Sequence, residues 1–566
     1  MQLKPCFFAS AFASLLFSNY ITPVYAKEQY ALLIGIGKYE HQPTLEGPPN
    51  DVALLKETLI KQWHFKPDHI QVLLDQQATK KDILNGFNQL EKTSHAGDEV
   101  FIYYSGHGIS PSTPGVGQFN LPANSGALLP WETPSKEADP QGFKDSLIIP
   151  KKDLKEQALL KLNKNRQVFV ALDTCYSANT MRGLGKHKQG ADILDSRSPF
   201  TPEKVKYGDK DRTEDNDEYS YKENIILLSA ASADEVARDI KEEHLPQFPT
   251  LSGRPQGVFS DALIGVLQCN IPADSNRDQR IDYSELTQAV RDYLKAKHQT
   301  QTPHLLPSLM DDSEHNITKR TVFGVQGCPK TTTPEPVTKL KVHLEAEAQK
   351  LQDAVSSMSH VVLTDAEQAD LTVQVHNGAY RLLNGMHDVV TSETQHMTTE
   401  QLKNRIKQEA IVHKLSATQR QQKDFNINLE LAGQRSGLIR YEGERFTLTA
   451  QSEKSAYWLL LDVQADGSVT VLYPISNAEN ALQPAPKAFK LPTNNPPIKV
   501  QPPFGIDHLL AFAFTEPPRW LPQFMGKTLE LGNKDFDQLI QHLDTTHSSY
   551  SFIDLDMLTF AKSNHP

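Results

Sequence analysis

At 566 residues the chain is too long for a single hydrophobic core, so two or three domains are expected. Its hydrophobic fraction of 38% and charged fraction of 22% are ordinary for a globular protein. The net charge of −11 argues against nucleic acid or an anionic membrane as the main partner, because both would repel the protein.

Residues 1–26 have the pattern of a secretory signal peptide. Lys4 precedes the apolar run FFASAFASLLF, and Val24 and Ala26 occupy the −3 and −1 positions of a cleavage site before Lys27. A membrane anchor is the alternative, but the run is short for a bilayer span. We expect cleavage here, no transmembrane anchor in the mature protein, and a periplasmic or secreted location.

Cleavage would leave three cysteines, Cys175, Cys269 and Cys328. In an oxidising compartment, an odd number of cysteines leaves one thiol outside any disulfide within the chain. Cys269 and Cys328 are candidates for a disulfide, which the sequence alone does not prove.

From residue 28 to residue 328, strand-like apolar runs alternate with helical patterns. The alternation predicts an α/β domain with a mostly parallel sheet and helices on both faces. A long polar insertion separates Cys175 from Asn224, and an insertion of this length in a compact domain is usually functional or mobile. The alternating runs are YALLIGIG, DVALLKETLIKQW, HIQVLLD, KKDILNGFNQLEK, EVFIYYSG, KDLKEQALLKLN, QVFVALDT and NIILLSAA.

The rest of the chain divides into a linker and a second part. Residues 329–337 are rich in Thr and Pro and indicate a linker, and residues 338–430 mix helical patterns with one strand-like run, ADLTVQV. Residues 440–518 have a β-rich pattern, in which an Asp-Gly pair between two apolar runs predicts a hairpin. The tail, residues 519–566, is predicted to be partly helical.

Two reactive side chains follow two of the predicted strands. His107 stands just past EVFIYYS, and Cys175 stands just past QVFVALD. Functional groups in parallel sheets collect beyond the C-terminal ends of strands, so adjacent strands would bring both side chains to one edge. A neighbouring imidazole makes the thiolate accessible and then passes a proton to the leaving amine. The pair therefore predicts a nucleophilic cysteine with a histidine general acid/base.

Glycines on both sides of His107 free the main chain around the imidazole. The amides of Gly108 and Cys175 would together form an oxyanion hole, in which one donor contributes about 3 kcal/mol in the transition state. A core histidine and a buried structural cysteine are the alternatives for each residue taken singly. Their matched positions at two strand ends favour the catalytic interpretation.

Four separated blocks, ALLIGIGKYEH, LEGPPNDVALL, IYYSGHG and ALDTCYSA, occur in this order. They resemble the caspase-like cysteine peptidases, specifically the metacaspase and bacterial orthocaspase branch of peptidase family C14. The resemblance covers residues 29 to about 325 and implies a caspase-hemoglobinase fold, with His107 as general acid/base and Cys175 as nucleophile. Residues 440–518 resemble DUF4384, a domain of unknown function often appended to bacterial caspase-like proteins.

The resemblance also implies a pocket for a basic substrate side chain. Metacaspases hold Arg or Lys with acids, and the matching positions here are Asp51 and Asp173, with Ser105 as the pocket serine. Two carboxylates facing one guanidinium make a charge-assisted, directional pocket. The alternatives are that Asp51 is the N-terminal acid of a helix and that Asp173 caps a turn. The sequence departs from the family at Tyr176 and Pro48, where metacaspases commonly have histidine and cysteine.

The segment DSNRDQRIDYSE, residues 274–285, has the spacing of an EF-hand loop. Helical patterns flank it, Ile281 occupies the usual apolar position, and Gln279 stands where glycine is expected, which demands a strained main chain. An acidic surface turn with a helix cap is the alternative. We expect a calcium (Ca2+) site of modest affinity, whose ligands are Asp274, Asn276, Asp278, Arg280 through its carbonyl, Asp282 and Glu285.

These observations predict a secreted cysteine endopeptidase that cleaves peptide or protein substrates after Arg or Lys. Calcium stimulation is implied by the resemblance alone. Basic residues in the insertion after Cys175 would suit self-processing, and a solvated loop is the alternative. The competing hypotheses are a catalytically idle scaffold that binds a partner through its C-terminal domain, and an aspartate-directed caspase, for which no pocket arginine can be placed.

Overall fold

The protein is described here by a computed structural model, in which none of the described helices is long and apolar enough to cross a bilayer. The predicted signal peptide, most of the polar insertion and the linker lie outside the described residues. Cys269 is disulfide-bonded, and Cys328, the partner considered from the sequence, lies outside the described residues. The described residues are 27–109, 126–149, 153, 159–162, 166–174, 195–196, 224–231, 237–246, 248–297, 299, 301–306, 317–325, 339–358, 360–384, 396–420, 425–433, 439–477, 479–491, 497–530, 533–544 and 549–561.

The N-terminal half is built on a sheet whose described strands run in the order β11-β8-β6-β3-β1-β2. The neighbours from β8 to β2 pair in parallel, and β11 pairs antiparallel with β8. This confirms the mostly parallel sheet that the alternating pattern predicts. The strands are β1 (Gln29–Gly35), β2 (Ile70–Leu74), β3 (Glu99–Ser105), β6 (Gln167–Asp173), β8 (Ile225–Ser229) and β11 (His304–Leu306).

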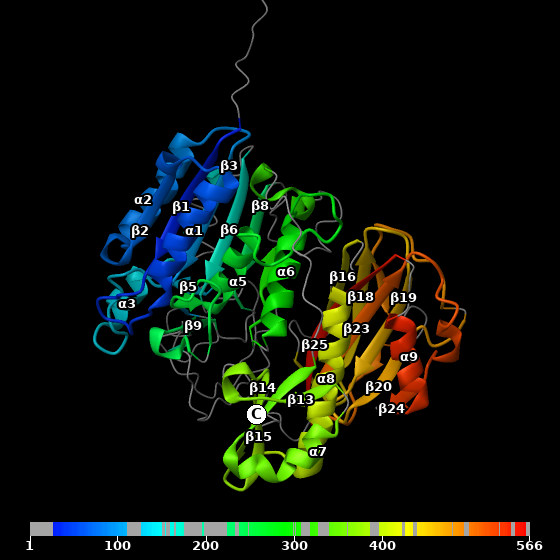
Figure 1. Ribbon diagram of the computed structural model, residues 1–566. Helices are drawn as coiled ribbons and strands as arrows, with labels where there is room; N and C mark the ends of the chain where they lie inside the picture. Colours follow the sequence, from blue (N-terminus) through cyan, green and yellow to red (C-terminus); the bar gives the residue numbers. More distant parts are fainter. Residues whose placement is uncertain are drawn as a thin grey trace, which may run out of the picture.

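Helices cover both faces of this sheet (Figure 1). Successive strand residues face opposite sides, so Tyr103 lies in one hydrophobic core and Tyr104 in the other. Burial on both faces explains why the strands are near-continuous apolar runs. The first core contains residues of α1 (Gly47–Trp63), α5 (Val258–Leu267) and α6 (Tyr283–Ala296), and the second contains residues of α2 (Lys80–Thr93), α3 (Pro140–Ser146) and α4 (Leu160–Leu162).

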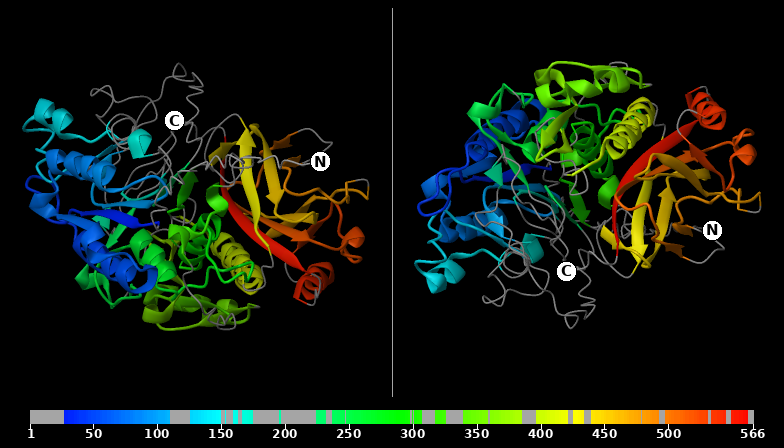
Figure 2. Two further views of the ribbon diagram at one scale, coloured as in Figure 1. Left: turned by 90° about the horizontal axis from the view of Figure 1, so that it is seen from above. Right: turned by 90° about the horizontal axis from the view of Figure 1, so that it is seen from below.

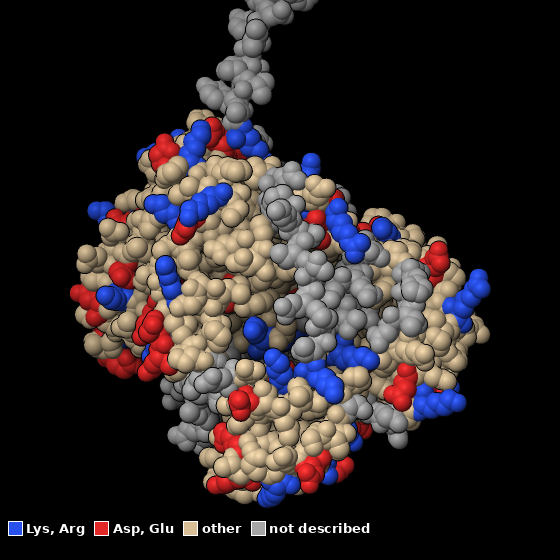
Figure 3. Space-filling model, viewed as in Figure 1, with Lys and Arg blue, Asp and Glu red and all other residues tan. Residues whose placement is uncertain are grey.

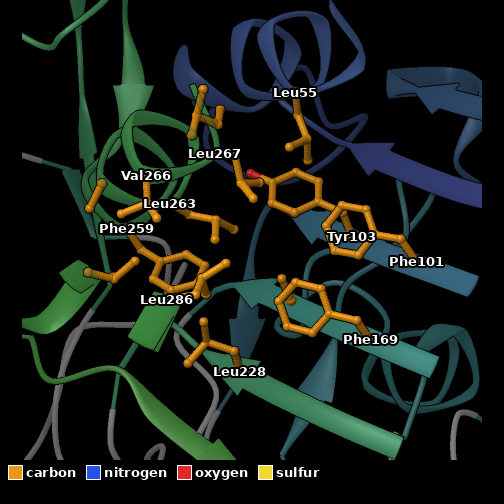
Figure 4. Packing of buried hydrophobic residues seen from close by; sticks show 14 of the residues in the cluster. Leu55, Phe101, Tyr103, Phe169, Leu228, Phe259, Leu263, Val266, Leu267 and Leu286 are labelled. Carbon is orange, nitrogen blue, oxygen red and sulfur yellow. The ribbon is translucent and has the colours of Figure 1, made fainter. Parts of the chain in front are cut away.

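The first core positions α5 against the centre of the sheet. Figure 4 shows Phe259 and Leu263 of α5 beside Phe169 and Leu228 of two neighbouring strands. The start of this helix is thereby held close to the edge where β3 and β6 end. Short strands complete this half, and they are β4 (Gly108–Ile109), β5 (Ala127–Leu128), β7 (Asp195–Ser196), β9 (Arg238–Ile240) and β10 (Gln256–Gly257).

A small sheet with two helices follows the predicted linker. Its strands run in the order β13-β12-β14-β15, and β14 (Leu371–His376) coincides with the predicted strand-like run. The long helix α8 (Thr399–Arg420) contacts this sheet, α6 of the N-terminal half and β25 of the last domain. Figure 2 shows α8 lying between these parts. The remaining elements are β12 (Leu340–Leu344), β13 (Val361–Leu363), β15 (Ala379–Asn384) and α7 (Gln352–Ser356).

The C-terminal domain is a pair of facing sheets. One has the order β16-β18-β21, with β22 also pairing β18, and the other has the order β17-β25-β23-β19-β20-β24. Apolar side chains from both sheets form one core, and α8 and α9 cover the other face of the larger sheet. The elements are β16 (Ile427–Gly433), β17 (Ile439–Tyr441), β18 (Arg445–Ser452), β19 (Tyr457–Val463), β20 (Ser468–Tyr473), β21 (Phe489–Leu491), β22 (Ile498–Lys499), β23 (Ile506–Phe514), β24 (Thr528–Glu530), α9 (Lys534–Asp544) and β25 (Tyr550–Phe560).

The structure extends this domain beyond the predicted limits of 440–518. The predicted hairpin is present, since β19 and β20 pair antiparallel across a turn in which Gly467 has φ 83°. However, β16 precedes the predicted range, and β25 comes from the predicted tail yet pairs with β23 inside the larger sheet. The tail therefore contains the helix α9, as predicted. It also contains the strand β25, with the sequence YSFIDLDMLTF, which the sequence analysis did not predict.

Ionic and polar contacts join the N-terminal half to the C-terminal domain. Lys295 Nζ of α6 lies 2.7 Å from both Asp554 and Asp556 of β25. Lys319 Nζ lies 2.5 Å from a carboxylate oxygen of Glu453. On the face drawn in Figure 3, Lys and Arg side chains gather near the centre, and Asp and Glu side chains lie mostly toward the outer sides.

Candidate active site

Strands β3 and β6 end side by side, as the sequence predicts. They are neighbours in the sheet, and Ser105 at the end of β3 pairs in register with Asp173 at the end of β6. Their continuations stay together, because Gly106 N–H donates to the Asp173 carbonyl over 3.3 Å. His107 follows two residues after Ser105. Cys175 follows two residues after Asp173 and itself lies outside the described residues.

His107 is buried with its imidazole in a defined orientation. Its side chain is enclosed, with an exposed fraction of 1% for the residue, and Nε2 lies 2.7 Å from the carbonyl oxygen of Pro43. A carbonyl oxygen only accepts hydrogen bonds, so Nε2 carries the proton in this contact. In the neutral ring, Nδ1 is then the basic nitrogen.

Two tyrosines hold the main chain of His107. Its amide donates to Tyr39 Oη over 2.7 Å, and Tyr104 Oη donates to its carbonyl oxygen over 2.8 Å. The Tyr39 ring also lies against the imidazole, with ring centroids 4.8 Å apart. The histidine is therefore fixed through its main chain as well as through its ring.

Asp51 is completely buried beside the end of β3. Its carboxylate accepts a hydrogen bond from Ser105 Oγ at 2.8 Å and another from the amide of Gly257 at 3.1 Å. Helix α1 begins at Gly47, so Asp51 lies in its second turn and does not cap it. The alternative of a capping acid is therefore wrong, and Asp51 and Ser105, predicted to be pocket partners, are in direct contact.

Asp173 is also completely buried, and the start of α5 holds it. The amide of Ser260 donates to Asp173 Oδ2 over 3.1 Å, and Ser260 Oγ donates to the same oxygen. Tyr103 Oη contacts that hydroxyl in turn. Both predicted pocket acids thus accept hydrogen bonds from the first turn of α5 and its N-cap Gly257, where the helix N-terminus favours negative charge.

Gly108 lies in the short strand β4, opposite Leu128 of β5. Leu128 exchanges both of its main-chain hydrogen bonds with Ile148 on its other side. Hydrogen-bonded and non-bonded pairs alternate in an antiparallel ladder, so the amide of Gly108 points away from β5. This direction suits the predicted oxyanion donor. The second predicted donor, the amide of Cys175, lies outside the described residues.

The loop of residues 274–285 is wound by its own hydrogen bonds. Asp274 accepts from the amide of Gln279 over 2.9 Å, and Asp278 accepts from the amide of Arg280 over 2.8 Å. Gln279 has φ 66°, which is the strained conformation expected where the pattern has glycine. The amide of Asp278 donates to Asn276 over 2.8 Å. These bonds wrap the first half of the loop around its side-chain oxygens.

The second half of the loop has a helix-capping arrangement. Asp282 is the N-cap of α6 and forms a capping box with Glu285, whose carboxylate also accepts from the amide of Ser275 over 3.0 Å. Burial, followed by the charge of Asp282, raises the pKa of Glu285 to about 7. Burial also raises the pKa of Asp282. Within the described part of the chain, no three Asp, Glu, His or Cys side chains are gathered so as to hold a metal ion.

The sequence interpretation missed several residues that surround the site. Pro43, Tyr39 and Tyr104 orient His107, while Gly257 and Ser260 bond the pocket acids. Tyr39 and Tyr104 belong to the blocks that carry the family resemblance, which was the available signal for them. The segment around Gly257 has no such signal, because its partner Asp51 is 206 residues away in the sequence.

The fold and the site define an α/β protein with a buried, oriented histidine and paired acids beyond the ends of parallel strands. The family model of the caspase domain, peptidase C14, matches residues 28–313. The chain belongs to this family of cysteine peptidases, as its four sequence blocks predict. The model of DUF4384, a domain of unknown function, matches residues 441–517, close to the predicted range.

The relatives that the chain resembles are metacaspases. Metacaspase-7 of Arabidopsis thaliana is 28% identical over 158 residues, which are 26% of this chain and 34% of that protein. Metacaspase-3 of Trypanosoma brucei brucei is 23% identical over 312 residues, which are 54% of this chain and 78% of that protein. Among solved structures, pro-sf-caspase-1 is 11% identical with a TM-score of 0.28, and the match covers 49% of this chain and 86% of that one. The chain thus spans about a third of the first relative and most of the second.

Proposed function

We propose that the protein is an endopeptidase that cleaves after Arg or Lys, with Cys175 as nucleophile and His107 as general acid/base. The observation that carries the proposal is the convergence of Asp51, Ser105 and Asp173 beside His107, at the edge where the strand leading to Cys175 ends. Caspase-family membership supplies the cysteine peptidase class. The two carboxylates supply the preference for a cationic side chain.

The proposed reaction passes through an acyl-enzyme. His107 Nδ1 takes the thiol proton of Cys175, and the thiolate attacks the scissile carbonyl carbon while Nε2–H remains bonded to Pro43. The amides of Gly108 and Cys175 would receive the developing oxyanion. The imidazolium gives its proton to the leaving amine as the peptide C–N bond breaks. Water then attacks the thioester, His107 takes a proton from it, and the thiolate leaves.

Peptide hydrolysis with purified protein tests this proposal. Fluorogenic peptides ending in Arg, Lys or Asp are incubated with the wild type, Cys175→Ala and His107→Gln. We expect turnover after Arg and Lys, and its loss by at least about 1,000-fold in both variants, because the two residues act as one unit. Cleavage after Asp alone would overturn the pocket assignment.

An idle scaffold that binds a partner through its C-terminal domain is the alternative function. It predicts that neither the wild type nor Cys175→Ala cleaves any of the three peptides. Alkylation of Cys175 by iodoacetamide separates the two functions further. A peptidase has an activated thiolate that reacts faster than a free thiol of ordinary pKa, and that reactivity falls in His107→Gln.

Calcium binding at residues 274–285 is a further part of the proposal. The wound first half of the loop supports it, and Glu285 would have to exchange its bonds to Ser275 and Asp282 for the ion. The ligands would be those predicted from the sequence, and the ion would stabilise the loop beside α6. We expect calcium to raise the thermal unfolding temperature of the wild type but not that of Asp274→Ala. Equal unfolding curves with calcium and with a chelator would contradict it.

Secretion and self-processing complete the proposal, and both concern segments outside the described residues. Secretion would show as a mature protein that begins at Lys27, which N-terminal sequencing of the exported protein would test. Self-processing would show as wild-type enzyme cutting Cys175→Ala protein within residues 179–222, after Arg or Lys. Intact Cys175→Ala protein after incubation with active enzyme would argue for an uncut, solvated insertion.

A further inference from the structure

We propose that Tyr39 and Tyr104 are positioning residues that together fix the main chain and the ring of His107 for catalysis. The inference rests on the proposed function, in which His107 is the general acid/base. It concerns two side chains that come from separate segments. Tyr39 follows β1, and Tyr104 is the penultimate residue of β3.

The two hydroxyl groups form a chain of hydrogen bonds between the polar main-chain groups of His107. The His107 amide donates to Tyr39 Oη over 2.7 Å, and the Tyr104 hydroxyl donates to the His107 carbonyl over 2.8 Å. The two tyrosine oxygens lie 3.4 Å apart. Because Tyr104 donates to carbonyl oxygens, Tyr39 is the donor in this last contact. The hydrogen bonds thus run from the N–H of His107 through the two hydroxyl groups to the C=O of the same residue.

This chain replaces an ordinary sheet hydrogen bond. Leu129 N–H donates to the His107 carbonyl over 3.1 Å, which is one half of an antiparallel pair. In a regular ladder, the His107 amide would donate to the Leu129 carbonyl. Instead, that amide donates to Tyr39, and the single O–H of Tyr104 is shared between the His107 carbonyl at 2.8 Å and the Leu129 carbonyl at 2.9 Å. The two hydroxyl groups therefore take the place of a direct hydrogen bond between the strands at His107.

Gly106 makes room for the two hydroxyl groups. A Cβ atom at this position would lie 2.6 Å from Tyr39 Oη and 3.0 Å from Tyr104 Oη. Real Cβ atoms do not approach another atom that closely, so any other residue here would push the tyrosines away. The sequence interpretation assigned Gly106 to freeing the main chain around the imidazole, and the two tyrosine hydroxyl groups give a second reason for a glycine at this position.

The segment that carries Tyr39 is anchored at both ends. Asp75 Oδ1 accepts from the amides of Gly37 and Lys38, both at 2.9 Å. At the other end, Asp239 Oδ2 accepts from the amide of Gly47 over 3.2 Å. The same segment contributes the Pro43 carbonyl to the imidazole Nε2, so one rigid loop sets both the ring and the main chain of His107.

The Tyr39 ring adds a contact that its hydroxyl does not provide. It lies 4.8 Å from the imidazole, centroid to centroid, with an angle of 39° between the planes. Loss of the ring would allow the imidazole to turn away from Pro43, whereas loss of the hydroxyl alone would loosen the main chain. Phenylalanine and leucine substitutions therefore separate the two contributions.

The test combines kinetics with nuclear magnetic resonance of histidine-labelled protein. We expect kcat to fall about 10-fold in Tyr39→Phe and in Tyr104→Phe, and about 100-fold in Tyr39→Leu, since small displacements of a catalytic group cost this much. KM should change by less than about twofold, because neither residue belongs to the substrate pocket. The Tyr39→Phe/Tyr104→Phe double variant should fall no further than about 10- to 20-fold, because the hydroxyls act as one chain.

Tyr30→Phe is the matched control. Tyr30 belongs to β1, the strand that precedes Tyr39, and stacks on His69 with centroids 4.3 Å apart, at the opposite edge of the sheet. Its kcat and KM should equal those of the wild type. Equal kcat in Tyr39→Phe, Tyr104→Phe and wild type would overturn the proposal, as would a change confined to KM.

The resonance readout separates this inference from the proposed function. The His107 ring signals, identified by their loss in His107→Gln, should show a protonated Nε2 in the wild type and an altered shift in Tyr39→Phe and Tyr39→Leu. A wild type that cleaves no peptide would overturn the proposed function, while these shifts would still decide the positioning. Unchanged His107 signals in both folded Tyr39 variants would overturn it.

Discussion

Buried aspartates occur in both halves of the molecule, but their surroundings differ. In the peptidase domain, Asp51 and Asp173 each accept hydrogen bonds from a main-chain amide and a hydroxyl group. In the C-terminal domain, Asp462 and Asp507 are each exposed by only 7%, and Asp462 accepts a hydrogen bond from the Gln464 side chain over 3.3 Å. The same type of side chain is thus buried among different donors.

The difference follows from the donors that the fold supplies. Amide and hydroxyl donors favour the charged form of a carboxylate, which suits the proposed contact of Asp51 and Asp173 with a cationic side chain. In the C-terminal domain, burial outweighs the hydrogen bond from Gln464 and raises the pKa of Asp462 to about 7, and burial together with the Asp462 charge raises the pKa of Asp507 to about 9. Burial of an acid therefore does not by itself mark a binding site.

The largest expected effect concerns the two acids of the proposed substrate pocket. We expect Asp173→Asn to lower kcat/KM for Arg and Lys peptides at least about 100-fold, because it would remove one of the two charges that the proposed pocket offers to the substrate cation. Asp51→Asn should act similarly. Steady-state kinetics on the fluorogenic peptides measures both effects.

A buried acid at the other edge of the same sheet is the control for this prediction. Asp98 accepts hydrogen bonds from the amides of Glu28 and His95, far from His107. Asp98→Asn should cost stability without changing peptide preference. If it lowers kcat/KM as much as Asp173→Asn does, the assignment of a specific pocket is wrong.

An intermediate effect is expected from the neutral acids of the C-terminal domain. Folded Asp462 and Asp507 keep protons up to about pH 7 and about pH 9, whereas unfolded aspartates ionise near about pH 4. The stabilisation of the folded state by these two protonated acids is therefore full below about pH 4. It is lost as the pH rises through about 7 and 9. At about pH 9.5, Asp507→Asn should be more stable than wild type by about 1 to 3 kcal/mol.

Scanning calorimetry of the full chain at about pH 6 and about pH 9.5 measures this change in the C-terminal transition. Asp535→Asn, on the exposed side of α9, is the control and should follow the wild type at both pH values. A wild-type transition that does not weaken at the higher pH would show that the two acids are charged in the fold, which would remove the contrast with the peptidase domain.

The smallest effect is expected where the two halves meet. Lys295 contacts Asp554 and Asp556 of the C-terminal domain, with its side chain 24% exposed and that of Asp554 3% exposed. Lys295→Met should lower the free energy of unfolding by about 1 to 2 kcal/mol, because it removes the charge facing a buried acid. Urea unfolding measures the change.

The exposed pair Lys61–Glu57 is the matched control for this prediction, and Lys61→Met should cost less than about 0.5 kcal/mol. Equal costs for the two lysine variants would mean that the contact between the halves adds little. The halves would then be connected mainly through the apolar surface of α8.

The sequence by itself determined which segments form the parallel strands and where two reactive residues stand in the chain relative to the ends of those strands. Alternating apolar runs fix which segments become parallel strands, and His107 and Cys175 directly follow two of them. Neighbouring parallel strands end at the same edge, and the structure adds that β3 and β6 are neighbours, while Cys175 itself lies outside the described residues. The pocket positions Asp51, Ser105 and Asp173 came from the family resemblance, and the contact between Asp51 and Ser105 agrees with it.

Only the tertiary structure decided which groups surround these residues. Tyr39 meets His107 across 68 residues and Gly257 meets Asp51 across 206, and no local pattern records such pairings. The alternation in β25 is a local strand signal that the sequence interpretation did not use, but its place inside the sheet, between β17 and β23, was decided only by the tertiary structure. Periodicity reports what a segment buries, whereas a hydrogen bond between distant segments exists only once packing has brought its donor and acceptor together.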